Sequence, residues 1–173
     1  MSTNPPSDYS FDTSQEIKEL SKIPLNKRFV EEKDDITSYF KKIGEREGID
    51  FYPEVISEKL IELTAPMIMK LKNHYDRPRP KVLASKMGIK LNDIEMSSMK
   101  TPSYPSGHSV QGILIGNVLA TMFPLSAEEF IKAGKDISYS RNIARAHYKS
   151  DSKFGEVIGL ELHKYLKQQQ HGI

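Results

Sequence analysis

The segment at residues 101–109, which reads TPSYPSGHS, holds the residues best suited to chemistry. Pro105 constrains the chain before a helix expected from Gly107, and Ser106 is a residue type that caps helix N-termini. Gly107 leaves room for an anion to approach the free backbone N–H groups of that helix. His108 follows at once, and a reference pKa of about 6.5 suits it to donate or accept a proton. The segment predicts an anion site beside an acid–base group, although a surface turn before a core helix is the alternative.

A second candidate segment, residues 140–151, reads SRNIARAHYKSD. In a continuous helix Arg141 and His147 would lie about 120° apart, so both reach one ligand only if the helix breaks, which we expect near residues 145–150. Asp151 follows His147 by four residues and can accept from one ring nitrogen, which leaves the other lone pair free as a nucleophile or base. Asp151 is also suited to cap the next helix, and the two roles are compatible.

A third segment contains Lys70, His74 and Arg77. Lys70 and Arg77 are seven residues apart, so they are expected on one face of a helix, two turns from each other. They would supply positive charge to the same ligand, with His74 as a bystander. The alternative is that both cations are solvated and that residues 77–80, Arg-Pro-Arg-Pro, form an extended linker.

The rest of the chain is read as helices that position these segments. Apolar residues recur at helical spacing, and no stretch alternates with the period of a strand, so the predicted class is all-α. Pro66 should kink or interrupt the helix that contains it. Residues 81–99 are expected to form a loop with a helical turn. The expected helices are 15–22, 33–47, 53–75, 107–122, one that begins at 126, and 151–169.

Length and composition indicate a single domain. The chain has 173 residues, a hydrophobic fraction of 38% and a charged fraction of 28%, as in ordinary globular proteins. A net charge of +2 with dispersed basic residues does not indicate a nucleic-acid partner. The chain has no cysteine, which excludes disulfides and thiolate metal sites, and it shows no convincing spacing of Asp, Glu or His for a metal.

Residues 1–14 are polar and are predicted to be a flexible leader, followed by one helical domain over residues 15–173. The N-terminus has no apolar core typical of a secretory signal. No apolar run approaches the roughly 20 residues that a membrane-spanning helix needs. These features predict a soluble, cytoplasmic protein without membrane insertion, and they leave the oligomeric state open.

Taken together, the three segments resemble the type 2 phosphatidic acid phosphatase and vanadium haloperoxidase superfamily. Its pattern is Lys-x6-Arg-Pro, then Pro-Ser-Gly-His, then Ser-Arg-x5-His-x3-Asp. The matching residues are Lys70 with Arg77-Pro78, Pro105-Ser106-Gly107-His108, and Ser140-Arg141 with His147 and Asp151. The pattern covers a little under half of the chain. The form of the second block is most similar to soluble class A non-specific acid phosphatases.

The resemblance implies a helical bundle whose three segments line one pocket and transfer a phosphoryl group without a metal. It implies that His147 attacks phosphorus to form a phosphohistidine and that Asp151 orients His147. His108 would protonate the leaving oxygen and then activate water. Positive charges and amides would stabilise the transferred phosphoryl group, which carries charge on three oxygens. The phosphate-binding residues would be Lys70, Arg77, Ser106, Gly107 and Arg141.

The leading prediction is a phosphatase that hydrolyses a small phosphomonoester and needs no cofactor, with vanadate as an inhibitor. A second reading transfers the phosphoryl group to an alcohol instead of water. A third is a haloperoxidase with vanadate as cofactor, and a fourth is a non-catalytic phosphate binder. The pair of histidines with Asp151 argues against the fourth, because binding alone needs only cations and amides.

Overall fold

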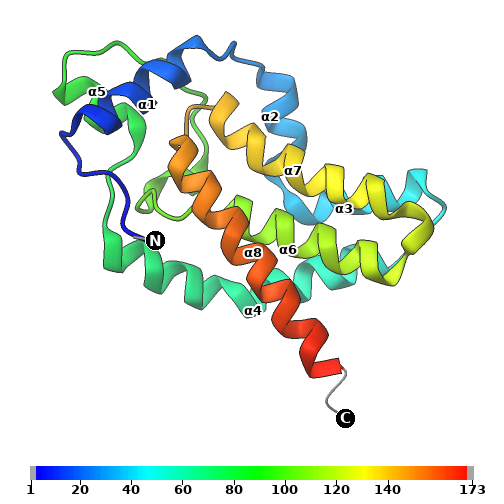
Figure 1. Cartoon of the computed structure of the whole chain (residues 1–173). Helices are drawn as coiled ribbons and strands as arrows, with labels where there is room; N and C mark the ends of the chain where they lie inside the picture. The colour runs from blue at the N-terminus through cyan, green and yellow to red at the C-terminus, as the bar shows by residue number, and fades with distance from the viewer. Residues whose placement is uncertain (1–2, 171–173) are drawn as a thin grey trace.

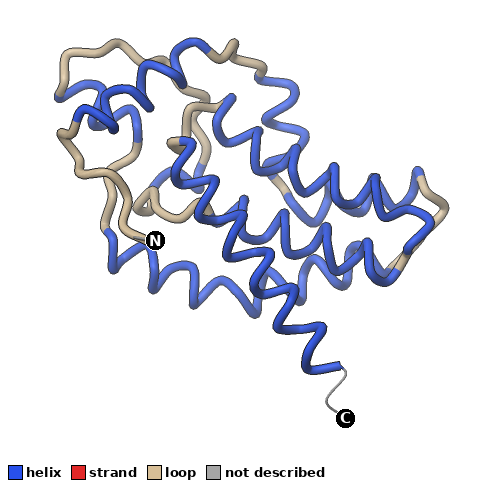
Figure 2. Tube along the Cα trace, in the orientation of Figure 1, coloured by secondary structure: helices blue, strands red, loops and turns tan. Residues whose placement is uncertain are grey.

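The computed structural model describes residues 3–170, and within this range every regular element is helical (Figures 1 and 2). This confirms the predicted all-α class. The elements are α1 (Phe11–Lys22), α2 (Lys27–Asp34), α3 (Ile36–Arg46), α4 (Tyr52–Tyr75), α5 (Pro80–Lys86), the 3-10 helix η1 (Ser97–Lys100), α6 (Gly107–Met122), the 3-10 helix η2 (Pro124–Ser126), α7 (Ala127–Ile143) and α8 (Lys149–Gln170). Long helices cross one another around a central helix, and α1, α5 and several loops gather at one end of the bundle (Figure 1).

Two helix starts differ from the sequence-based expectation because short polar side chains cap them. Helix α1 begins at Phe11, within the predicted leader, since the Ser10 hydroxyl accepts from the Thr13 N–H at 3.2 Å. The single helix expected over residues 33–47 is two helices, because Asp35 accepts from the Ser38 N–H at 3.0 Å and so starts α3. The leader is therefore shorter than predicted, and its flexibility stays a prediction; residues 1–2 lie outside the described residues.

Two further expectations concern the middle of the chain. Helix α4 runs without interruption through Pro66. Pro66 is exposed, so water can reach the backbone carbonyl that the proline leaves without a partner. Residues 81–99 contain most of α5 and the start of η1, which agrees with a loop that includes helical turns.

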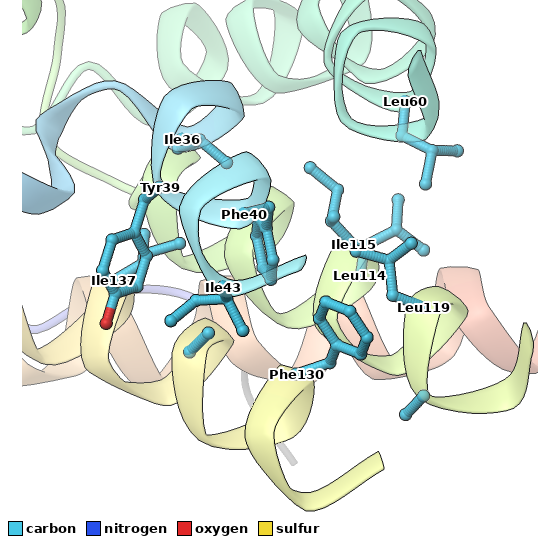
Figure 3. Packing of buried hydrophobic residues seen from close by; sticks show 12 residues of the cluster. Ile36, Tyr39, Phe40, Ile43, Leu60, Leu114, Ile115, Leu119, Phe130 and Ile137 are labelled. Atoms are coloured by element: carbon cyan, nitrogen blue, oxygen red, sulfur yellow. The ribbon is translucent and has the colours of Figure 1, made fainter. Parts of the chain in front are cut away.

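Helix α6 is the core of the bundle. Its apolar residues are distributed around the whole helix, and a helix of this kind is buried on all sides. Helices α3, α4 and α7 pack around it, with Phe40 and Phe130 among the fully buried residues (Figure 3). The resulting cluster contains Ile36, Tyr39, Phe40, Ile43, Leu60, Leu114, Ile115, Leu119, Ala120, Phe130, Ala133 and Ile137.

Glycine allows α8 to approach the first turn of α6. A Cβ atom added to Gly155 would lie 2.6 Å from the Ser106 carbonyl oxygen and 2.8 Å from Cβ of Ser109. Both distances are too short for a real contact, so a larger residue would push the helices apart. The close approach places Asp151, at the start of α8, beside the N-terminus of α6.

The predicted break between α7 and α8 is confirmed. Helix α7 ends at Ile143 and α8 begins at Lys149. Between them Arg145 has a left-handed backbone with φ of 59°, and its guanidinium donates to the carbonyls of Ser21, Ile23 and Asn92. This turn directs His147 inward. Within residues 3–170, none of the helices is both long and apolar enough to cross a membrane.

Candidate active site

His147 lies between Asp151 and Arg79. Its Nδ1 is 3.1 Å from Oδ2 of Asp151, and its Nε2 is 2.9 Å from Nη1 of Arg79. A guanidinium only donates hydrogen bonds, so Nε2 must carry the ring's lone pair and Nδ1 the proton. The pKa of His147 is held well below 6.5 by burial and by the charges of Arg79, Lys72 and Arg141. The neutral ring therefore presents a directed lone pair at Nε2.

Asp151 is fully buried and accepts hydrogen bonds on both oxygens. Oδ1 accepts from Nη1 of Arg77 at 2.7 Å. Oδ2 accepts from the Tyr148 N–H at 3.1 Å and from the Ser103 hydroxyl, in addition to His147. Burial raises the pKa of Asp151 to about 6, against the lowering effects of Arg77 and of these hydrogen bonds. The contacts fix the carboxylate and leave it in position to hold the Nδ1 proton of His147.

Arg79 uses all five of its N–H groups. Nε donates to the Thr101 carbonyl at 2.8 Å, and Nη2 donates to the Ser98 carbonyl at 2.8 Å and to the Thr101 hydroxyl at 3.2 Å. Nη1 donates to the Ala146 carbonyl at 3.1 Å as well as to His147. The guanidinium is thus fixed by three backbone carbonyls, and one of its edges faces the histidine.

Lys72 is a second buried cation beside this pair. Its Nζ donates to the Thr101 hydroxyl and to the Pro102 carbonyl, both at 3.1 Å. Burial, with smaller contributions from Arg79 and Arg141, lowers the pKa of Lys72 to about 7. Both of these hydrogen-bond partners are uncharged, so the ammonium is a buried cation that could pair with a bound anion.

Arg141 approaches from α7 and is fully buried. Nη1 lies 3.2 Å from Oδ1 of Asp34, the last residue of α2. Nη2 donates to the Ser98 hydroxyl at 3.2 Å and lies 3.4 Å from the Met96 sulfur. The buried Nε has no hydrogen-bond partner. An unpaired buried N–H costs free energy, and the Nε atoms of Arg77 and Arg145 are buried without a partner as well.

His108 lies at the first turn of α6 and also contacts Asp34. Its Nε2 is 2.8 Å from the Asp34 carbonyl oxygen, which only accepts, so Nε2 carries a proton. The pKa of His108 is held well below 6.5, first by burial and then by the charge of Arg141, with smaller effects of His147 and Lys72. Arg141 and Lys72 thus act on both His108 and His147, so the two rings lie in one positively charged environment.

The first turn of α6 completes the cluster. Ser106 is buried at the N-cap, where its hydroxyl accepts from the N–H of Ser109 at 3.2 Å and from its hydroxyl at 2.9 Å. A Cβ added to Gly107 would lie 3.8 Å from Cε of Lys72, so the glycine backbone lies alongside the lysine. The start of α6 and Lys72 therefore border the same space.

The structure does not bring Lys70 to this cluster, which corrects the sequence-based assignment. Lys70 is exposed, whereas Lys72 is buried. The buried face of α4 includes Leu60, Thr64 and Ile68 at steps of four residues, and the next step is Lys72. This spacing is visible in the sequence and could have identified the buried lysine.

Arg77 is also placed differently from its predicted role. It pairs with Asp151 and Glu16, while Arg79 contacts His147. The Lys-x6-Arg-Pro pattern occurs twice because the sequence reads Arg-Pro-Arg-Pro, and the second copy, Lys72 with Arg79-Pro80, is the one whose cations gather at the site. The remaining predicted residues, Ser106, Gly107, His108, Arg141, His147 and Asp151, do come together. Sequence reasoning missed Asp34, Ser98, Lys72 and Arg79.

An open pocket of about 550 Å³ borders the cluster at Arg79. Its walls include apolar side chains and both signs of charge. Met96 and Ser97 belong to its wall, and the same segment contacts Arg141 through Met96 and Arg79 through the Ser98 carbonyl. Within residues 3–170 no group of three His, Asp or Glu side chains has the arrangement of a metal site. The remaining lining residues are Lys81, Val82, Asp93, Glu95, Met99 and Lys100.

Comparison with known sequences identifies one matching family and several similar phosphatases. The sequence model described as "PAP2 superfamily" matches residues 60–172. The chain is similar to a non-specific acid phosphatase of Salmonella typhimurium, with 38% identity over 88 residues, and to one of Salmonella typhi, with 36% identity over 88 residues. It is 32% identical over 91 residues to an acid phosphatase of Zymomonas mobilis subsp. mobilis. The matched region covers 51–53% of this chain but only 34–35% of each relative.

Proposed function

Because this chain belongs to the PAP2 superfamily, we propose that it is a phosphatase that hydrolyses a small phosphomonoester through a phosphohistidine at His147. One observation carries the proposal. Asp151 holds Nδ1 of His147 while the Nε2 lone pair points toward the guanidinium of Arg79. A nucleophile and the cation for the group it attacks are therefore adjacent, as phosphoryl transfer requires.

In the first step, a phosphoryl oxygen takes over the hydrogen bond that Arg79 makes to His147. The Nε2–P bond then forms, the bond from phosphorus to the leaving oxygen breaks, and His108 in its protonated form gives that oxygen a proton. Asp151 stabilises the positive charge that develops on the ring of His147. Burial disfavours protonated His108 in the free protein, and a bound phosphate dianion favours it.

In the second step, neutral His108 takes a proton from water as the water oxygen bonds to phosphorus. The P–Nε2 bond breaks, phosphate is released, and both histidines return to their starting states. Lys72, Arg79 and Arg141 stabilise the charge on the equatorial oxygens in both steps, together with the backbone N–H groups at the start of α6. Three cations beside one anion support a reaction that needs no metal.

The proposal is tested with p-nitrophenyl phosphate and a set of phosphorylated metabolites, in buffer with a metal chelator. We expect release of inorganic phosphate, inhibition by vanadate, and loss of nearly all activity in His147→Ala. Rapid quenching should trap an acid-labile, alkali-stable phosphoryl group on the protein, and this group should be absent from His147→Ala. His74→Ala is the matched control, because His74 is exposed on α4.

Two results would assign a different activity to the same site. A new phosphoester formed when an alcohol acceptor is added would show that the same intermediate serves a phosphotransferase. Bromide oxidation by peroxide in vanadate-loaded protein, without phosphate release from any ester, would favour a haloperoxidase. Wild-type activity in His147→Ala would contradict the proposed nucleophile.

A further inference from the structure

Arg77 is a buried arginine that has no part in the mechanism above. Its side chain is 1% exposed, and Nη1 donates at 2.7 Å both to Oδ1 of Asp151 and to the Ser150 hydroxyl. Asp151 therefore has a dedicated cation on the oxygen that does not contact His147. This leaves Oδ2 free to hold the Nδ1 proton of the histidine.

Glu16 of α1 pairs with the other terminal nitrogen of Arg77. Its Oε2 accepts from Nη2 of Arg77 at 3.1 Å and from the Ser150 hydroxyl at 2.8 Å. Its Oε1 accepts from the Ser150 N–H at 2.8 Å, in the first turn of α8. Glu16 lies outside residues 60–172, the part of the chain that matches the family. The N-terminal helix thus reaches the residue that orients His147.

The ring of Tyr148 packs against the guanidinium of Arg77 and helps to hold it in position. The guanidinium carbon of Arg77 lies 3.7 Å from the centre of the Tyr148 ring. The Tyr148 hydroxyl donates to the Pro78 carbonyl at 3.1 Å, and its N–H donates to Oδ2 of Asp151. A planar, always charged guanidinium suits this stacked position with two carboxylate partners, and a lysine does not.

We propose that Glu16 and Arg77 are positioning residues, which hold Asp151 as an ionised, correctly oriented partner of His147, and that α1 is consequently a working part of the active site. This inference rests on the proposed function for its kinetic consequences. Its structural consequence is the placement of the proton on Nδ1 of His147, which can be measured without turnover.

Polar and charged groups from several segments of the chain lie close to Asp151. Ser103 from the loop before α6 and the Tyr148 N–H from the connection before α8 donate to it, with His147 and Arg77. Lys72 and Arg79 act on it at longer range. Arg77 is the strongest influence that favours the ionised carboxylate against burial, so its loss extends the protonated state of Asp151 to higher pH.

The experiment compares Arg77→Met, Arg77→Lys and Glu16→Gln with the wild-type chain. For Arg77→Met we expect kcat to fall roughly 100-fold with KM changed less than about threefold, and the acidic limb of the kcat/KM profile to move to higher pH. Arg77→Lys should recover part of the kcat because it keeps the charge without the forked geometry. Glu16→Gln should lower kcat by roughly three- to tenfold, also with little change in KM and with the acidic limb moved to higher pH.

Glu19→Gln is the matched control for Glu16→Gln. Glu19 lies on the same helix and pairs with Lys149 of α8 at 3.3 Å, but both side chains are about half exposed. Like Glu16→Gln, the Glu19→Gln substitution removes one negative charge from a contact between α1 and α8. We expect it to change neither kcat nor the pH profile. A merely structural link between α1 and α8 would make the two variants alike.

A double-mutant cycle separates positioning from phosphate binding. In an Asp151→Asn background, Arg77→Met should change the residual kcat less than twofold, because its effect acts through Asp151. A raised KM and weaker vanadate binding in Arg77→Met with kcat unchanged would overturn the proposal and make Arg77 a phosphate ligand. If Arg77→Met does not fold, the values of kcat, KM and vanadate affinity in Arg77→Lys and Glu16→Gln distinguish positioning from phosphate binding.

The nitrogen-15 shifts of His147 keep this test independent of the proposed function. The wild-type ring should be mainly the tautomer with the proton on Nδ1, and Glu16→Gln and Arg77→Lys should increase the Nε2–H fraction. An unchanged tautomer and unchanged kinetics in both variants would overturn the inference. A wild-type protein without phosphatase activity but with the expected tautomer shifts would contradict only the proposed function.

Discussion

Nη1 of Arg79 lies 2.9 Å from Nε2 of His147, so a cation holds the lone pair that the proposed mechanism uses for attack. The same guanidinium is fixed by the carbonyls of Ser98, Thr101 and Ala146. A bound phosphoryl group would replace one contact of Arg79 without moving the others. In the proposed mechanism, the hydrogen bond would therefore prepare both the geometry of the histidine and the position of the incoming phosphorus.

Arg79→Lys should lower kcat/KM by roughly 100-fold or more, since a lysine cannot reproduce the forked donors that meet a phosphoryl group. Steady-state kinetics with p-nitrophenyl phosphate measure this loss. Arg46→Lys, an exposed pair with Glu129 at the surface, is the control and should behave as wild type. An active Arg79→Lys variant would return the phosphate-binding role to Arg77.

The pKa of Lys72 predicts the alkaline side of the pH profile. Burial lowers this pKa to about 7, so the ammonium is charged below pH 7 and neutral above it. The pKa is depressed, and phosphate binding that depends on the charge is therefore lost as the pH rises through about 7. KM should increase above this pH in the wild-type chain and should be high at every pH in Lys72→Met. Lys70→Met should keep the wild-type profile, and a Lys70→Met variant that loses it would contradict the assignment of Lys72.

Lys72→Met should also stabilise the fold in mildly acidic solution. Folding lowers the lysine pKa from 10.5 to about 7, so the unfolded chain binds the proton more tightly. The resulting cost is full below pH 7 and disappears as the pH rises toward 10.5. At pH 6 we expect an increase of about 1–3 kcal/mol in the free energy of unfolding, measured with urea. Lys59→Met, at an exposed position of α4, should change it little; a destabilised Lys72→Met would mean that the hydrogen bonds of Lys72 outweigh its desolvation.

We expect Asp34 to compete with a bound anion for Arg141. Its carboxylate lies 3.2 Å from Nη1 of Arg141, and its negative charge would repel phosphate in the same site. In Asp34→Asn we expect inhibition constants for phosphate and vanadate to fall by roughly three- to tenfold at low salt. The 2.8 Å contact to His108 should survive because it uses the main-chain carbonyl, whereas the 3.6 Å contact between His108 Nε2 and Asp34 Oδ1 loses its negative charge. Asp136→Asn, at a surface pair with Lys132, is the control, and weaker anion binding in Asp34→Asn would show that Asp34 mainly orients Arg141.

The sequence by itself determined the helical class, the N-cap serine at the start of α6, and the pairing of His147 with Asp151. These features depend on local rules: helical periodicity, an N-cap serine before glycine, and a four-residue step that brings a carboxylate to a ring nitrogen. The break before Lys149 was also predictable, since Arg141 and His147 could not otherwise face one ligand.

Only the tertiary structure decided which cations lie beside His147. Lys70 with Arg77 and Lys72 with Arg79 satisfy the same spacing, so the pattern cannot choose between them. The choice follows from which face of α4 is buried against α6, and that burial is a property of packing. Glu16 and Asp34 come from N-terminal helices without any recognisable motif, and they reach Arg77 and Arg141 because the bundle folds distant segments together. Spacing along a chain specifies the geometry of neighbours within one helix, whereas contacts between helices depend on how their surfaces fit.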